Sequence, residues 1–124
     1  MILTFVCIAI GGGVGAISRY KIDKEITNKI HHEISFGTLG VNLIGLFIIG
    51  FSYAIFKNHI VSENLKHFFV VGFLGALTTF SSYALHTFQL LEKKKIKKAI
   101  INILLNNFLG MIFALLGSEL GQFF

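Results

Sequence analysis

Residues 68–91 read FFVVGFLGALTTFSSYALHTFQLL, a run without Asp, Glu, Lys or Arg. A helix of about 20 residues, rising about 1.5 Å per residue, crosses the roughly 30 Å hydrocarbon core of a bilayer. The middle of the run, Thr-Thr-Phe-Ser-Ser-Tyr at 78–83, nevertheless alternates hydroxyl and aromatic side chains. Lipid offers such groups no water, so the cluster either satisfies itself within the protein or lines a passage.

Three further apolar stretches accompany this run. The chain has 124 residues, of which 54% are hydrophobic, and a mean hydropathy of +0.76. These values predict an all-α membrane protein, multi-pass in the cell membrane, rather than a soluble domain. A signal peptide is the alternative for the first stretch, but no Lys or Arg precedes it and three more spans follow. We therefore predict one four-helix transmembrane domain over residues 1–124, with spans at about 1–18, 36–56, 68–91 and 99–118.

The connections between the spans carry most of the charge. Residues 20–35 place isoleucine at every fourth position from Ile22 to Ile34, which predicts an amphipathic helix lying at the membrane interface. Nine lysine or arginine residues lie in the first and third connections and two in the second. The positive-inside rule then places connections one and three in the cytoplasm and both termini outside. Because the lysines flank apolar blocks, the net charge of +5 does not indicate a nucleic-acid partner.

Groups with familiar chemistry are scarce. Spans two, three and four contain no Asp, Glu, Lys or Arg away from their ends, so the embedded carboxylate of a proton-coupled transporter is missing. Paired acids, a Ser–His–Asp set and metal-ligand spacings are missing too, which argues against an enzyme. Cys7 is alone in an apolar stretch and is interpreted as a small hydrophobe. His86 is the only deeply placed histidine, and a lone histidine there is more often packed and hydrogen-bonded than functional.

The remaining candidates are uncharged donors and aromatic rings. Asn42 lies in the first half of span two, and Asn102 and Asn106 share one face of span four at i, i+4. Phe80 and Tyr83 point the same way at i, i+3. Taken singly, each asparagine is explained by hydrogen bonding between helices, and the aromatic pair by core packing. Together, neutral donors and positively polarised ring edges suit a small anion that must bind weakly enough to leave.

Three segments resemble the Fluc, or CrcB-type, fluoride channels. They are Gly-Gly-Gly-Val-Gly-Ala-Ile-Ser-Arg-Tyr at 11–20, Gly-Thr-Leu-Gly-Val-Asn-Leu-Ile-Gly at 37–45 and Gly-Ala-Leu-Thr-Thr-Phe-Ser-Ser-Tyr at 75–83. The third is specific, and the number and order of the spans agree. The resemblance implies an antiparallel dimer with two narrow fluoride pores and a third helix broken near its middle.

The resemblance also assigns roles to particular residues. A structural sodium ion, not transported, is held by the backbone carbonyls of Gly75 and Thr78. Asn42 and Phe80 match pore residues, and Arg19 matches a basic residue at the aqueous vestibule. The further pore-lining candidates are Ser81, Tyr83, Asn102 and Asn106.

The chain also departs from the family pattern. Tyr83 stands where the family usually has a second phenylalanine, and its phenol adds a hydrogen-bond donor. Asn106 lies near a position where the family usually has a serine. An antiparallel homodimer needs chains that insert both ways, which the charge bias opposes. A heterodimer with a paralogous subunit of opposite orientation is the equal alternative.

The expected function is passive efflux of fluoride, which limits its toxicity in the cytoplasm. Two rivals remain. A four-span exporter of the small multidrug type would be expected to carry an embedded glutamate in its first span. In a non-conducting structural subunit of a membrane complex, polar side chains such as Asn102 and Asn106 would serve only to hold helices together.

Overall fold

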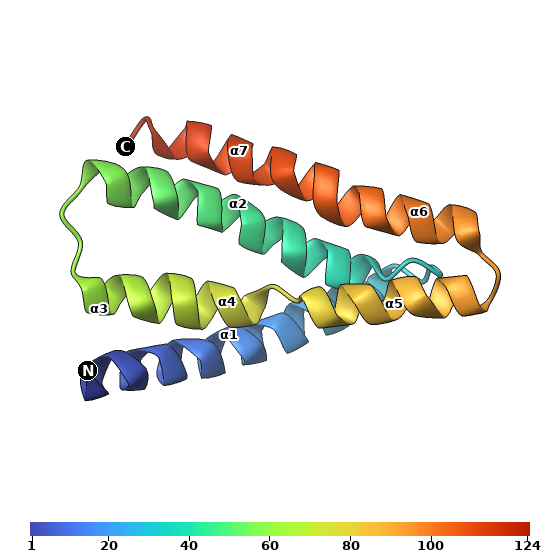
Figure 1. The fold of residues 1–124 in the computed structure, drawn as a ribbon, viewed down its shortest axis with the longest axis horizontal. Coiled ribbons are helices and arrows are strands. Elements are labelled where there is room, and N and C mark those ends of the chain that lie inside the picture. The colour runs from blue at the N-terminus through green and yellow to red at the C-terminus, as the bar shows by residue number, and fades with distance from the viewer.

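The computed structural model describes all 124 residues as an up-and-down bundle of four long helical segments (Figure 1). All four are long and apolar enough to cross a membrane. The first is α1 (Ile2–Lys29) and the second is α2 (Phe36–Asn58). The third comprises α3 (Glu63–Lys66), the π-helix η1 (His67–Leu74), α4 (Gly75–Leu77) and α5 (Phe80–Glu92). The fourth comprises α6 (Ile96–Leu104), the π-helix η2 (Leu105–Leu109) and α7 (Gly110–Gly121).

Both termini and the α2–α3 connection lie at one end of the bundle, and the other two connections lie at the opposite end (Figure 1). The basic C-terminal part of α1 and the lysine-rich α5–α6 connection therefore lie toward the same end. The segment Phe36–Asn58 starts at the predicted residue, while Glu63–Glu92 and Ile96–Gly121 start five and three residues earlier. The three segments end one to three residues later than predicted. Helices continue into the interface until a capping residue or a turn stops them.

The interface helix predicted for residues 20–35 is not a separate element. Residues 2–29 form one continuous helix, α1, and only residues 30–35 connect it to α2. The reason is that no glycine or proline interrupts the chain between Arg19 and Lys29. At about 1.5 Å per residue, α1 is about 42 Å long, so it either tilts or projects beyond the hydrocarbon core.

The third segment has two non-helical residues near its middle. Thr78 (φ −81°, ψ 155°) and Thr79 (φ −145°, ψ 117°) are extended, and the chain bends between α4 and α5. The hydroxyl of Thr78 donates to the carbonyl of Leu74 at 3.2 Å, while that of Thr79 accepts from the N–H of Ser82 at 3.2 Å. One threonine thus satisfies the end of α4, and the other caps the start of α5.

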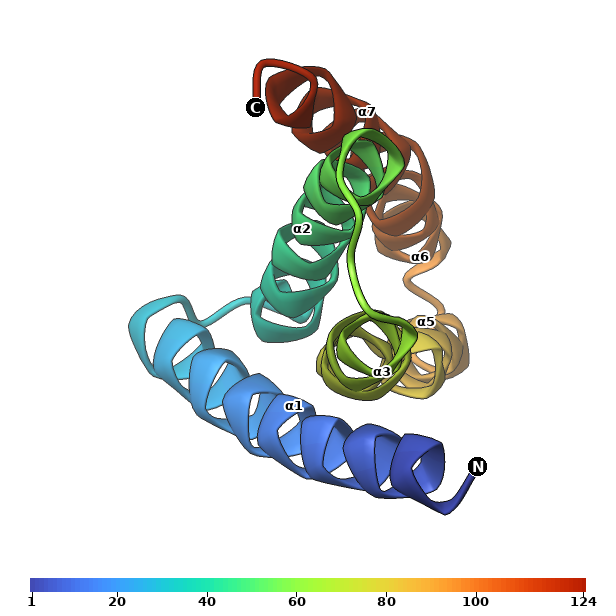
Figure 2. The ribbon, with the colours of Figure 1, turned by 90° about the vertical axis from the view of Figure 1, so that its left-hand side faces the viewer.

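Glycines bring the segments into close contact in two pairs, α1 with η1 and α2 with α7 (Figure 2). A Cβ atom at Gly11 would lie 2.1 Å from the carbonyl oxygen of Phe68. In the second pair, a Cβ atom at Gly117 would lie 2.0 Å from the carbonyl oxygen of Phe47. Helix backbones that approach this closely gain dispersion energy. This matters in a membrane, because apolar lipid leaves no hydrophobic driving force for helix association.

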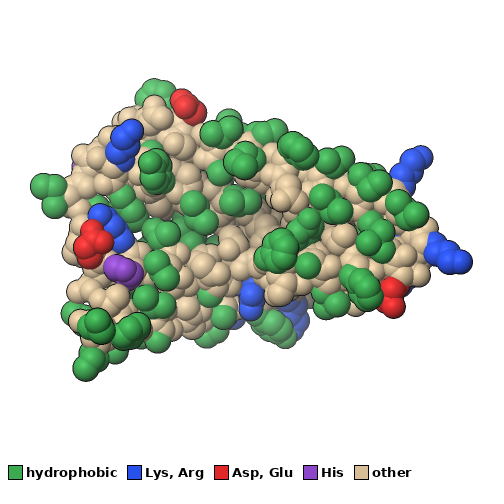
Figure 3. Space-filling model, in the orientation of Figure 1, with side chains coloured by type: hydrophobic (Ala, Val, Ile, Leu, Met, Phe, Trp, Pro, Cys, Tyr) green, Lys and Arg blue, Asp and Glu red, His purple; other side chains and the backbone are tan.

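Much of the lateral surface is apolar (Figure 3). Only 24 of 124 residues are buried within the chain, and large side chains such as Phe108 and Leu115 are more than 60% exposed. In a soluble protein such a surface would aggregate, but lipid or a second subunit covers it in a membrane protein.

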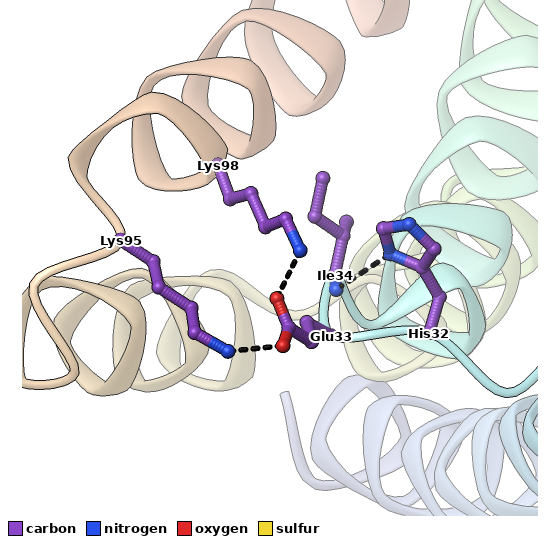
Figure 4. A network of polar contacts seen from close by, with 5 residues as sticks. All are labelled: His32, Glu33, Ile34, Lys95 and Lys98. Atoms are coloured by element: carbon purple, nitrogen blue, oxygen red, sulfur yellow. Dashed lines mark hydrogen bonds and ion pairs between the residues drawn. The ribbon is translucent and has the colours of Figure 1, made fainter.

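Glu33, in the α1–α2 connection, pairs with two lysines at the start of the fourth segment (Figure 4). Its carboxylate accepts hydrogen bonds from both Lys95 and Lys98. Beneath this ion pair, Ile34 packs with Leu90 and Ala99 in a small buried cluster. Hydrogen bonds from the two lysines lower the pKa of Glu33 from 4.5 to about 2.

The low pKa of Glu33 predicts an acid-sensitive contact. A carboxyl whose pKa is depressed on folding stabilises the protein above its unfolded pKa and loses that stabilisation as the pH falls toward the folded value. Glu33→Gln should therefore lower the melting temperature slightly at pH 6, and the difference should vanish between about pH 4.5 and 2. Thermal unfolding in detergent measures this. Glu25→Gln, at an exposed glutamate of α1, is the control, and an equal loss there would refute the assignment.

Candidate functional site

A cleft of about 230 Å³ opens on the surface between α2, the bend of the third segment and η2. Its floor lies where the two non-helical threonines face Asn42 of α2. The lining mixes amides, hydroxyls, aromatic rings and aliphatic groups and carries no charged side chain. The lining residues are Asn42, Leu46, Ile49, Thr78, Thr79, Phe80, Tyr83, Asn106 and Asn107.

Asn42 pairs with the backbone of the bend. Its Oδ1 accepts from the N–H of Thr79 at 2.7 Å, and its Nδ2 donates to the carbonyl of Thr79 at 3.1 Å. In a continuous helix the N–H of Thr79 would instead donate to the carbonyl of Gly75. Asn42 therefore satisfies the buried polar groups of the bend and withdraws the helical partner of the Gly75 carbonyl.

The Thr78 carbonyl loses its helical partner in the same way. In a continuous helix this carbonyl would accept from the N–H of Ser82, but that N–H donates to the hydroxyl of Thr79. The bend also leaves the carbonyls of Ala76 and Leu77 without backbone donors, so Gly75 and Thr78 are two of the four carbonyls that it releases. The cation-site role of Gly75 and Thr78 stays a prediction. Gly75 itself is exposed, and a Cβ atom there would meet nothing closer than 3.7 Å.

A chain of side-chain hydrogen bonds leads from Asn42 along the fourth segment. Asn42 Nδ2 donates to Asn106 Oδ1 at 3.0 Å, and Asn106 Nδ2 donates to Asn102 Oδ1 at 3.1 Å. Asn102 Nδ2 then donates to the hydroxyl of Thr87 at 2.9 Å, which donates to the carbonyl of Tyr83 at 2.8 Å. All three asparagines are at most 8% exposed. The amides thus fasten α2, α5 and the fourth segment together, as buried polar groups in lipid require.

Two aromatic rings form one side of the cleft. Phe80 and Tyr83 meet edge to face, with ring centroids 5.5 Å apart. The Phe80 side chain is 77% exposed, so within a single chain its ring has little cover. The phenol oxygen of Tyr83 lies 3.0 Å from Nδ2 of Asn107, which donates to it.

The sequence-predicted site residues fall into two groups. The cleft brings together Asn42, Thr78, Phe80, Tyr83 and Asn106. The others lie outside its lining: Asn102 is buried behind Asn106, Ser81 is exposed with its hydroxyl 3.3 Å from that of Thr79, Gly75 is on the exposed face of α4, and Arg19 is half-buried on α1.

His86 is hydrogen-bonded, as predicted from the sequence. Its Nδ1 lies 3.3 Å from the hydroxyl of Thr38, which also accepts from the hydroxyl of Ser35. These polar groups lie at the start of α2, at the end of the bundle that carries Glu33.

A family model described as "CrcB-like protein, Camphor Resistance (CrcB)" matches residues 6–118. The chain belongs to the CrcB family. A relative from Sulfurimonas denitrificans is 44% identical over 90% of this chain and 87% of its own length. One from Helicobacter pylori is 41% identical over 100% of this chain and 97% of its own length. One from Parabacteroides distasonis is 38% identical over 98% of this chain and 94% of its own length. All three are named "Fluoride-specific ion channel FluC". With its four membrane-spanning helices, this CrcB-family chain is a multi-pass protein of the cell membrane.

Sequence reasoning assigned no pore or metal role to three residues of this CrcB-family site. Thr79 contributes its backbone, which no side-chain pattern reveals. Thr87 follows Tyr83 at i+4, a spacing that would have placed it on the same face of the helix. Asn107 is next to Asn106 in the sequence, and because η2 is π-helical both amides reach the cleft.

Proposed function

We propose that this chain forms a fluoride channel that lets cytoplasmic fluoride escape passively and so limits its toxicity. The observation that carries the proposal is a charge-free cleft, within the membrane-spanning segments, lined by neutral donors and ring edges. The names of the relatives support fluoride as the ion. Hydrogen fluoride is a weak acid that enters cells and dissociates at the higher internal pH, so a passive exit suffices.

Neutral groups suit conduction of fluoride. Amide, hydroxyl and ring-edge groups replace the water around a small anion without the strong attraction of a full positive charge. The Coulomb energy of a buried ion pair would slow release of the anion. The positive end of the α5 dipole, which begins at Phe80 beside the cleft, adds a further weak attraction.

The conducting unit is an antiparallel dimer. One chain leaves the cleft open on its surface and the ring of Phe80 exposed, so a closed pathway requires a second copy or a paralogous subunit. Fluoride flux through this chain expressed and reconstituted alone would exclude an obligate heterodimer. Arg19, in the C-terminal half of α1, would raise the anion concentration at the vestibule.

A structural sodium ion would be held at the bend of the third segment, between the two subunits. The carbonyls of Gly75 and Thr78 have lost their helical partners at the bend, and two from each subunit would give the cation four oxygen ligands. The exposed position of Gly75 leaves room for a partner subunit.

The sodium site predicts a cation requirement. Replacing sodium on both sides of the membrane with N-methylglucamine, which is too large for the site, should lower fluoride flux. Efflux from proteoliposomes measures this, with potassium as a second comparison. Equal flux in all three salts would refute the cation site.

Substitution of Phe80 separates a channel from a structural subunit. Phe80→Ile keeps an apolar side chain but removes the ring edge, so fluoride efflux should fall by at least about tenfold while the dimer stays intact. Phe88→Ile is the matched control, because Phe88 is also exposed on α5 but lies outside the cleft. Unchanged flux in a folded Phe80→Ile dimer would favour the structural subunit instead.

A further inference from the structure

The hydrogen-bond donors around the cleft are nearly all engaged within the chain. Both N–H groups of the Asn42 amide and both of Asn106 have protein acceptors. The hydroxyl of Thr78 donates to the carbonyl of Leu74. Thr79 shares its hydroxyl with Ser81. An anion that enters the cleft can therefore bind these amides and hydroxyls only by displacing one of their bonds within the chain.

Tyr83 is different, because its hydroxyl group is held from one side only. The amide of Asn107 donates to the phenol oxygen at 3.0 Å and to the carbonyl of Ile103 at 2.8 Å. A carbonyl only accepts, so the second contact fixes which atom of the Asn107 amide is nitrogen. The phenol oxygen must then be the acceptor in the first contact, and its own O–H hydrogen has no acceptor within the chain.

The surroundings direct this free hydrogen. Tyr83 lines the cleft, its ring is held edge to face against Phe80, and its oxygen is occupied by Asn107 on the side of η2. The O–H rotor turns away from a donor that occupies the oxygen lone pair. A donated bond from Asn107 also polarises the phenol and makes its hydrogen a stronger donor.

We propose that the Tyr83 hydroxyl is a fluoride ligand and that Asn107 is its positioning residue, which holds the O–H toward the anion path. The proposal rests on the proposed function and goes beyond it by assigning an oriented donor and a supporting amide. The two residues act as a unit, so removing either should weaken the same interaction.

A double-mutant cycle tests this by fluoride current through planar bilayers, recorded across fluoride concentrations. A hydrogen bond to a charged group changes affinity by about tenfold or more, so Tyr83→Phe should raise the half-saturating fluoride concentration by about tenfold. Asn107→Leu should raise it by about threefold through loss of orientation. In the Tyr83→Phe background, Asn107→Leu should add nothing. Tyr53→Phe, which removes the same atom from an exposed tyrosine of α2 outside this cleft, is the matched control.

The outcomes separate the inference from the function. If the wild-type chain carries fluoride and Tyr83→Phe matches it, the ligand assignment is wrong while the channel stands. If Asn107→Leu weakens conduction equally with and without the phenol, Asn107 acts through the fold and the positioning role is wrong. A folded dimer of the wild-type chain that carries no fluoride overturns both.

Discussion

Asn42→Ala should reduce fluoride flux by at least about 100-fold. The substitution removes both bonds to the Thr79 backbone and the donor to Asn106. Each buried polar group left unpaired costs about 1–3 kcal/mol, and about 1.4 kcal/mol is a tenfold change in population. With two backbone groups unpaired, Thr79 should re-form helical bonds and the bend that creates the cleft should relax. Fluoride efflux from proteoliposomes, beside a dimer check in detergent, measures the loss.

Asn28→Ala is the matched control for this prediction. Asn28 lies on the exposed face of α1, near the end of the helix and away from the cleft. Fluoride flux through the Asn28→Ala protein should equal that through the wild type. A folded Asn42→Ala protein with wild-type flux would show that the pairing of α2 with the bend is dispensable.

Gly117→Ala should have the largest effect on stability, because α2 and α7 touch at their backbones. The added Cβ atom would lie 2.0 Å from the carbonyl oxygen of Phe47. Gly50 of α2, which faces α7, has equally little room, since a Cβ atom there would lie 1.9 Å from the carbonyl oxygen of Ala114. The helices must separate, which loses packing along their length. We expect a destabilisation of about 3 kcal/mol or a failure to fold, in the upper range for overpacked cores. The folded fraction during thermal unfolding in detergent measures it.

Gly13→Ala provides the comparison, since a Cβ atom at Gly13 would meet nothing within 4 Å in the chain. Its thermal stability as a monomer should equal or exceed that of the wild type, because alanine favours helix. If Gly117→Ala were as stable as Gly13→Ala, close backbone contact would not be what holds the bundle together.

The fold was largely predictable because its signals are local. Uncharged stretches of sufficient length locate the spans, and lysines beside Glu92 mark a connection. The extent of α1 was not predictable from charge, since a helix past the hydrocarbon core continues until something stops it. The π-helical turns η1 and η2 have no composition signal and follow from packing.

The site was predictable in its residue types but not in its bonding. Asn42, Phe80 and Tyr83 stand out as polar or aromatic groups in an apolar setting, and the cleft unites them. Long-range pairs, such as Asn42 with Thr79 and Asn107 with Tyr83, depend on how the helices are rotated against one another. That rotation is set by glycine contacts and π-turns spread over the chain, which one-dimensional patterns do not convey.

The most direct test of the central claim is anion efflux from proteoliposomes that contain this chain alone, with fluoride and chloride compared at equal concentration. The account predicts rapid fluoride efflux, little chloride efflux, and dependence of the fluoride flux on sodium. Comparable chloride flux, or no flux of either anion from vesicles that hold folded dimer, would contradict a fluoride channel built from neutral donors.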